Sequence, residues 1–342
     1  MYLNQDPLGA PFRIRDYTFP SFLVLGFAPA PAAPLGRGHT ALELHYSIVN
    51  NFQVSEPVER YLGQSRGNQP RPLDSADAAF ILGLPEGEAY YIDGEFVMVE
   101  LAAHWGITER IDLGFGINYI RYGGSVLDGV IYDFHDAIGV GQGGRQYVQD
   151  HQVQAVLGRD SGQDVVLLRR PSSGGLSDPN IFLRYALPTL LPRWGSSIEL
   201  GIKIPMMDEA DFLSTGSWDV GYQITLDRRF SRDALIINFG AVFPGKFEQT
   251  DLRPPNLPFL NLSWLHRFER WPHTRSFIQA LWAEHPYRAI VDSELSDLEF
   301  QITAGFKWDT RLGVFGVGLT ENVLNFDNTP DIGLHFTWGM LD

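Results

Sequence analysis

The chain has 342 residues, no cysteine and a formal net charge of −15. The lack of cysteine excludes disulfides and cysteine-ligated metal sites, and the negative charge argues against a nucleic-acid partner. Aromatic residues make up 13% of the chain, and mean hydropathy is −0.10. No apolar run approaches the roughly 18 residues of a membrane-spanning helix. Near-neutral hydropathy remains compatible with a membrane barrel, because the lumen-facing half of such a barrel is polar.

The first 38 residues carry no strand pattern. The opening "MYLNQDPLGAPFRIRD" has no apolar core of a secretory signal, and the signal-like stretch "FLVLGFAPAPAA" (22–33) starts far from Met1. We therefore interpret the chain as a mature protein whose signal peptide has been removed. Apolar residues at 19–27 favour packing against another surface, so residues 1–38 are predicted to be either a plug inside a barrel or a periplasmic tail.

From residue 39 onward, apolar and polar residues alternate with the period of two that is typical of strands. In 195–206, for example, Ile198, Leu200 and Ile202 alternate with glutamate, glycine and lysine. The predicted strands are 39–55, 90–107, 109–122, 179–188, 195–206, 217–229, 233–244, 257–268, 275–285, 297–308, 311–321 and 330–340. The pattern thus predicts about twelve strands, with aromatic residues such as Trp105, Trp218 and Trp308 near their ends.

The connections between these strands alternate between short and long. The short ones are 107–110, 189–196, 230–233, 270–275 and 308–311, and the long ones are 56–89, 123–178, 207–216, 245–256, 286–296 and 322–329. Bacterial outer-membrane barrels have short periplasmic turns and long extracellular loops. The sequence therefore predicts an all-β fold, a monomeric transmembrane antiparallel up-and-down β-barrel over 39–342. A large soluble β-barrel or sandwich is the alternative.

The last predicted strand contains "DIGLHFTW" (331–338) and is expected to close the barrel against the first. Its Gly333, Phe336 and Trp338 resemble the C-terminal signal that the barrel-assembly machinery reads, although "GMLD" follows the final aromatic residue. The expected partners are this machinery, outer-membrane lipids with lipopolysaccharide, and a small-molecule solute. The expected location is the bacterial outer membrane.

The longest loop, 123–178, is predicted to be extracellular and to hold a short helix, 126–138, followed by the glycine-rich "GVGQGG" (139–144). A hairpin is expected from 147–155 and 163–170, on either side of "GRDSGQD". The functional interpretation is a gate over the barrel mouth, with His135 and Arg145 facing the pore. Alternatively, the helix only decorates the extracellular end.

Strand periodicity directs many ionisable side chains into the lumen. They are the acids Glu43, Glu100, Asp112, Glu199, Asp219, Asp227 and Glu299, the bases Arg184, Lys203, Arg267 and Lys307, and the histidines His45, His104 and His335. Such groups line water-filled paths in channels, and an open lumen of this composition would prefer cations or neutral solutes. Paired charges filling a closed lumen are the alternative.

His45 and Ser47 share one strand face, and Asn51 follows on the same face. Outer-membrane lipid hydrolases use a similar His-x-Ser pair, in which histidine activates serine as a nucleophile. Those enzymes present the pair to the membrane, however, whereas periodicity here directs it into the lumen. No metal or cofactor is predicted, since the acidic stretch 325–331 lacks EF-hand spacing.

Three stretches, "LHYSIVNNF" (44–52), "YDFHDAIGVGQGGR" (132–145) and "LTENVLNFDNTPDIGLHF" (319–336), resemble a family of proteobacterial outer-membrane barrel proteins labelled as a domain of unknown function. The resemblance implies the barrel and its location, and it implies no activity or catalytic residue. The functional prediction is a narrow channel or transporter for small solutes with a loop-gated lumen. The alternatives are a lipid hydrolase built on His45 and Ser47 and a closed structural or surface-interaction barrel.

Overall fold

A computed structural model describes residues 10–67, 69–85, 87–123, 127–139, 141–158, 164–169, 174–188, 192–207, 209–289, 294–322 and 330–342. Several predicted features fall partly outside these residues: positions 1–9, the helix start at 126, the hairpin turn at 159–163 and the acidic stretch at 325–329. The side chain of His135 is likewise outside the described set.

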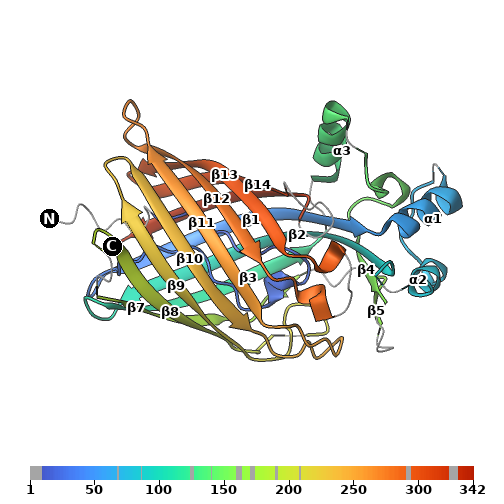
Figure 1. Ribbon diagram of the computed structural model, residues 1–342, viewed down its shortest axis with the longest axis horizontal. Coiled ribbons are helices and arrows are strands. Elements are labelled where there is room, and N and C mark those ends of the chain that lie inside the picture. The colour runs from blue at the N-terminus through green and yellow to red at the C-terminus, as the bar shows by residue number, and fades with distance from the viewer. Residues whose placement is uncertain are drawn as a thin grey trace.

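Twelve strands form a closed antiparallel barrel, which confirms the predicted fold class (Figure 1). They are β1 (Thr40–Val54), β2 (Tyr90–Gly106), β3 (Ile111–Tyr122), β7 (Asn180–Ala186), β8 (Gly195–Lys203), β9 (Asp219–Arg229), β10 (Asp233–Phe243), β11 (Leu257–Arg267), β12 (Thr274–Ala283), β13 (Glu299–Thr310), β14 (Gly313–Asn322) and β15 (Ile332–Leu341). The predicted strand limits differ from these by three residues or fewer.

The barrel closes where β15 pairs with β1, with Leu44 opposite Trp338 and Asn50 opposite Ile332. β1 also pairs with β2 along its whole length. Because β15 extends to Leu341, three of the four residues after Trp338 belong to the strand. The short connections lie at the barrel end that holds the C-terminus, and the long ones lie at the other end (Figure 1).

The outer face of the barrel carries a band of exposed apolar side chains. In the β7–β8–β9 region Leu183 lies opposite Leu200, which lies opposite Tyr222, and Leu200 is 52% exposed. Further members of the band include Leu44, Leu101, Phe115, Ile181, Val220, Ile278, Leu319 and Phe336. An apolar surface this extensive is not stable against water, so it indicates a lipid-facing wall. The soluble alternative, whose core would take these faces, therefore does not fit.

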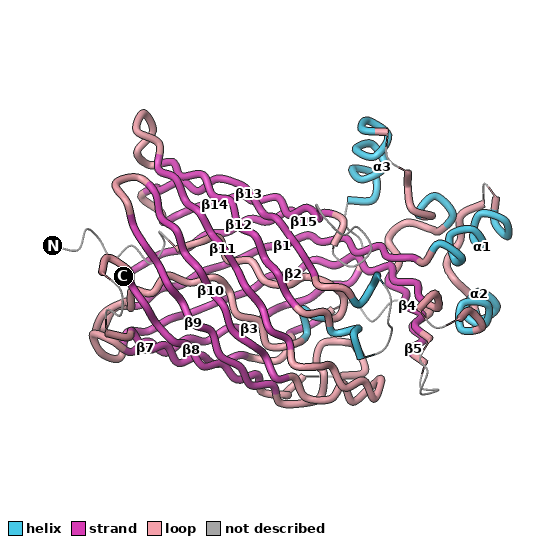
Figure 2. The backbone as a smooth tube through the Cα atoms, viewed as in Figure 1, coloured by secondary structure: helices cyan, strands magenta, loops and turns pink. Residues whose placement is uncertain are grey.

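Beyond the long-loop end of the barrel, β1 and β2 extend into a small additional sheet. There β2 pairs with β4 (Val153–Leu157), which pairs with β5 (Val165–Leu167). α1 (Glu56–Arg66), α2 (Ser75–Leu82) and α3 (Leu127–Ile138) gather at this end (Figure 2). None of the described helices is both long and apolar enough to cross a membrane.

Two of these helices, α1 and α2, are absent from the sequence prediction. α2 is short but well capped, because the Asp74 side chain accepts hydrogen bonds from the backbone of Ala76 and Asp77 in a capping box. α1 and α2 pack an apolar core with the sheet extension, through Val58, Leu62 and Ile81. Tertiary packing on β1, β2 and β4 therefore stabilises helices that are too short to be stable on their own.

Candidate functional site

The barrel encloses residues 10–38, here called the N-terminal segment. At the short-turn end, Lys307 Nζ donates a hydrogen bond of 3.0 Å to the carbonyl of Ala10. The chain then crosses the lumen to the long-loop end, where the Tyr287 hydroxyl donates to the carbonyl of Phe19. It returns to the short-turn end, where the amide of Gly38 donates to Gly106 at 2.8 Å. Both arms of the segment therefore run inside the barrel.

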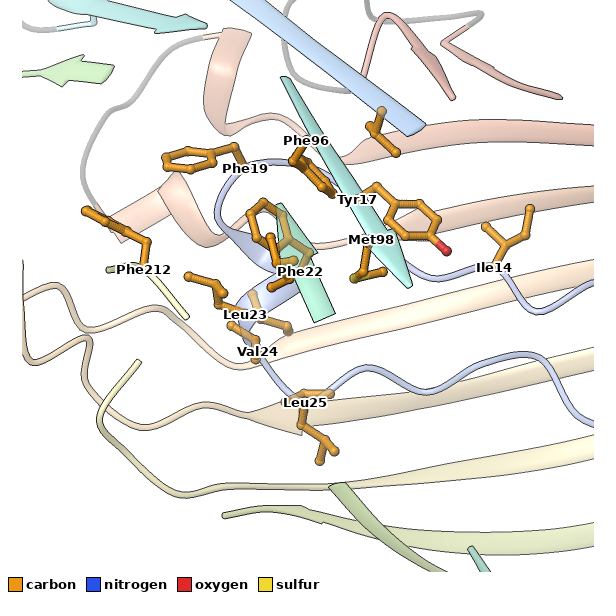
Figure 3. Packing of buried hydrophobic residues seen from close by; sticks show 14 of the residues in the cluster. Ile14, Tyr17, Phe19, Phe22, Leu23, Val24, Leu25, Phe96, Met98 and Phe212 are labelled. Atoms are coloured by element: carbon orange, nitrogen blue, oxygen red, sulfur yellow. The ribbon is translucent and has the colours of Figure 1, made fainter. Parts of the chain in front are cut away.

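Aromatic side chains of the segment fill the middle of the lumen. Phe12, fully buried, stacks on Phe277 of β12 with 4.7 Å between ring centroids. Near the long-loop end, Phe22 lies 4.2 Å from the ring of Phe96 in β2 (Figure 3). Figure 3 shows Leu23, Val24 and Leu25 continuing this cluster along the segment. The segment is thus packed like a protein core.

Glycines on the inner wall make room for these rings. A Cβ atom at Gly316 would lie 2.9 Å from Cε2 of Phe12, and one at Gly221 would lie 2.8 Å from Cε2 of Phe27. Real Cβ contacts are rarely so short, and the rings are held by packing on several sides. The glycine-rich inner faces that the sequence shows therefore match the shape of the enclosed segment.

The backbone of the segment is bound by side chains of the barrel. The amides of Leu25, Ala32 and Leu35 donate to Asp219, Asp227 and Asp112 at 2.9, 3.2 and 3.1 Å. Its carbonyls accept from Lys203 and Arg184, at Leu23 and Pro31, over 3.1 and 3.3 Å. Buried peptide groups need partners, and these two arms find them in the charged lumen residues instead of in a neighbouring strand.

The same charged residues are joined in ion pairs. Arg184 Nη2 lies 2.8 Å from Asp112 Oδ2, and Lys203 Nζ lies 3.0 Å from Asp219 Oδ2. The segment itself contributes Arg13, whose Nη2 lies 2.8 Å from Glu100 Oε1. The filled lumen therefore combines charge pairs between wall residues with the charge pair of Arg13 and Glu100, which joins the segment to the wall.

Most residues predicted to line the lumen are buried. These are His45, Glu100, Asp112, Arg184, Glu199, Lys203, Asp219, Asp227, Glu299, Lys307 and His335. Glu43 and His104 are partly exposed and border a cavity of about 30 Å³ between the two arms of the segment. Arg267, by contrast, is exposed at the end of β11. A second cavity beside the segment, lined by Ile14, Leu257 and Leu281, has a volume of about 60 Å³. Spaces of this size hold a few water molecules.

The His45–Ser47 pair of the hydrolase alternative is buried under the segment. Both residues meet the Tyr17 hydroxyl, at 3.1 Å from His45 Nε2 and 3.2 Å from Ser47 Oγ. Ser47 is also 2.9 Å from His335 Nδ1, and the Asn51 amide donates to the Tyr17 carbonyl. The pair is fully buried, so no lipid reaches it in this conformation. Tyr17 was not predicted, because its partners are far away along the chain.

The predicted gate residue Arg145 lies away from the lumen, which corrects that expectation. It is buried, with its guanidinium 3.1 Å from Asp128 of α3 and paired with Asp331 just before β15. Asp128 also accepts from Asn50 of β1. Successive strand residues point to opposite faces, and Asn51 contacts the segment, so Asn50 faces outward. A buried arginine needs carboxylates, and it finds them on this outer side of the wall.

The residues of the predicted assembly signal lie on β15. Gly333 is buried, whereas the Phe336 side chain is 44% exposed on the outer face of the barrel. Trp338 donates a hydrogen bond of 2.8 Å from Nε1 to the carbonyl of Leu312 in the neighbouring turn. The role of these residues in assembly stays a prediction.

Fold and lumen together define a twelve-stranded antiparallel barrel of the outer-membrane type with an internal N-terminal segment. The chain belongs to the family described as protein of unknown function (DUF3187), which matches residues 75–340. This confirms the resemblance drawn from the sequence. No curated protein matches the chain.

Solved structures match the chain at low sequence identity. The COG4313 outer membrane channel from Pseudomonas putida F1 is 11% identical, with a TM-score of 0.55 over 92% of this chain and 100% of that one. The Pseudomonas putida toluene transporter TodX is 8% identical, with a TM-score of 0.37 over 97% and 98% of the two chains. The first likeness supports the barrel fold.

Proposed function

We propose that the protein is an outer-membrane channel for small solutes, closed in the described conformation by its N-terminal segment. The observation that carries this proposal is the way in which the segment is held. It forms no strand of the barrel, and its backbone binds charged side chains of the wall, among them Asp219 and Asp227. A segment held by such contacts is able to leave without opening the wall.

The outer surface supports a location in the bacterial outer membrane. The apolar band around Leu200 requires lipid, and the pattern of long and short connections is that of bacterial outer-membrane barrels. Membrane lipids with lipopolysaccharide are the proposed surroundings, and the assembly machinery that reads such strands is the proposed folding partner. The loop 123–178 is not proposed as the gate, because Arg145 and Asp128 attach it outside the wall.

Displacement of the segment would also change the charge of the lumen. Arg13 and Arg15 leave with it, while Glu100 and the other wall carboxylates stay. The predicted inner wall holds more acids than bases, so the opened channel should prefer cations or neutral solutes over anions.

The test is conductance of the purified protein in planar bilayers, with liposome swelling for neutral sugars of graded size. A variant lacking residues 1–38 should conduct with cation preference and admit sugars. The matched control lacks only residues 1–9 and should behave as the full chain does. Circular dichroism and heat-modifiable migration on gels show that each variant is folded. If the folded 1–38 deletion stays at background, the barrel is a closed structural protein.

A further inference from the structure

A cluster of potential metal ligands lies at the long-loop rim, outside the barrel wall. Glu95 of β2, Asp128 in the first turn of α3 and His151 just before β4 each offer one ligand atom, and these atoms lie within 4.8 Å of one another. His151 Nδ1 is 3.0 Å from Glu95 Oε2 and 3.4 Å from Asp128 Oδ2. Three segments that are distant in sequence therefore converge here.

The surroundings of the cluster are rich in buried negative charge. Glu95 and Asp128 are buried, and so is Asp93, two residues before Glu95 on the same face of β2. Asp331 lies next to them, paired with Arg145. Arg145 is itself buried, and it contacts the Oδ1 atom of Asp128. The other oxygen of Asp128, Oδ2, accepts a hydrogen bond of 3.0 Å from the backbone amide of His151 and so lies at the cluster.

An amide oxygen with no partner lies beside the cluster. Asn50 of β1 is opposite Glu95 in the strand register, and its side chain is fully buried. Its Nδ2 donates to Asp128 at 2.9 Å, which places the amide group at the cluster. Among the residues that the structure describes, Asn50 Oδ1 has no hydrogen-bond partner. An unpaired buried amide oxygen is costly unless something coordinates it.

We propose that Glu95, Asp128 and His151 bind a divalent cation of the zinc type, with Asn50 Oδ1 or water completing its coordination. Two carboxylate oxygens and one imidazole nitrogen form the mixed oxygen and nitrogen donor set that Zn²⁺ accepts in proteins, with a fourth position left open. The cation would neutralise part of the buried negative charge. His151, 48% exposed, gives the site access to the external solution.

The bound cation would fasten the long loop to the barrel. Glu95 belongs to the wall, Asp128 to α3 and His151 to the chain entering β4, so one ion would join all three. A contact with the wall is already present without the ion, because Asp128 accepts a hydrogen bond from Asn50 of β1 while it also contacts Arg145. The sequence predicted no metal because the ligands, at positions 95, 128 and 151, form no spaced motif.

The test uses the full-length protein, stripped of metal with chelator and titrated with Zn²⁺ by isothermal calorimetry in detergent. The native chain should bind one equivalent, and binding should weaken at least tenfold in His151→Gln and in Glu95→Gln. The matched control is His273→Gln, an exposed histidine in the turn before β12, which should bind as the native chain does. The proposal would be overturned if His151→Gln bound zinc with the affinity of the native chain, or if the native chain bound no zinc.

A second measurement reports on the loop itself. Zn²⁺ should slow limited proteolysis within residues 141–158 of the native chain and of His273→Gln, and it should leave the cleavage of His151→Gln unchanged. Equal protection in all three proteins would place the zinc elsewhere and refute the site. Neither experiment depends on whether the barrel conducts, so the outcome is separate from that of the channel proposal.

Discussion

Arg13 and Glu100 join the N-terminal segment to the barrel wall through two hydrogen bonds onto one carboxylate oxygen, 3.0 Å from Nε and 2.8 Å from Nη2. The two side chains are 11% and 8% exposed. Removing one partner of so deeply buried a charge pair destabilises the protein far more than removing both, because the single charge left in the lumen is not compensated. The pair is therefore a direct test of how firmly the segment is seated.

The first prediction is that Glu100→Gln destabilises the seated segment by about 3–5 kcal/mol, the usual effect of stranding one buried charge. Single-channel recordings should then show openings that the native protein lacks. The double variant Arg13→Gln/Glu100→Gln, which strands no charge, should recover most of the closed state. Equal conductance of the single and double variants would show that the pair does not hold the segment.

The second prediction uses a reversible lock. A Cβ atom at Gly94 would lie 3.6 Å from Cβ of Phe19, within the range of a disulfide. Because the chain has no cysteine, Phe19→Cys/Gly94→Cys can form only this bond. Any conductance of the double variant should vanish on oxidation and return with reductant, whereas each single variant should not respond. Conductance that persists in the oxidised form would mean that solutes pass while the segment stays fixed to the wall at Phe19.

The third prediction concerns the lipid face. Leu200→Arg at the middle of β8 should cost about 2–4 kcal/mol of barrel stability, as arginine does near the bilayer midplane. Leu312→Arg is the control, since Leu312 is 76% exposed in the turn between β13 and β14 and lies outside the band. Urea unfolding in lipid vesicles measures both. Equal losses would contradict the lipid-facing assignment of the outer wall.

The fourth prediction concerns orientation. An epitope tag inserted after Glu209, in the long connection between β8 and β9, should be reached by antibody on intact cells. The same tag in the turn at 230–232, between β9 and β10, should be reached only after the cells are opened. The reverse labelling pattern would invert the barrel in the membrane.

The fifth prediction separates the channel from the hydrolase. Ser47→Ala should leave the phospholipid composition of cells unchanged, because Ser47 is fully buried and bonded to His335 and Tyr17. Its effect should be structural, a loss of about 1 kcal/mol for the missing hydrogen bond. Thin-layer analysis of lysophospholipid checks the first statement, and thermal unfolding checks the second. A fall in lysophospholipid in the variant would support the enzyme.

The wall of the barrel was predictable because each strand carries its own evidence. Period-two alternation in 195–206 or 217–229 is local, and so is the contrast between short and long connections. Closure of the last predicted strand against the first was also expected, and β15 pairs with β1. α1 and α2 were missed because they are short and because their stability comes from packing on Phe52 and Tyr91. These two residues lie in the strands β1 and β2, outside the helical segments themselves.

The contents of the lumen were only partly predictable. Periodicity identified Asp219 and Lys203 as inward residues, yet it had no information on what they bind. Besides pairing with each other, they bind backbone atoms of Leu25 and Leu23, and a backbone atom leaves no trace in a residue pattern. The position of Arg145 was wrong for a related reason: its carboxylate partners Asp128 and Asp331 are brought together only when the barrel closes.

The binding of the segment by its main chain has a consequence for its evolution and for its use. Asp112, Asp219 and Asp227 contact amide groups that every residue except proline possesses, so most substitutions at Leu25, Ala32 or Leu35 preserve these contacts. The wall residues should therefore vary less among homologues than the segment that they hold. For the same reason, an emptied barrel should accept a synthetic peptide supplied from outside, provided that it is extended and carries rings where Gly221 and Gly316 leave space.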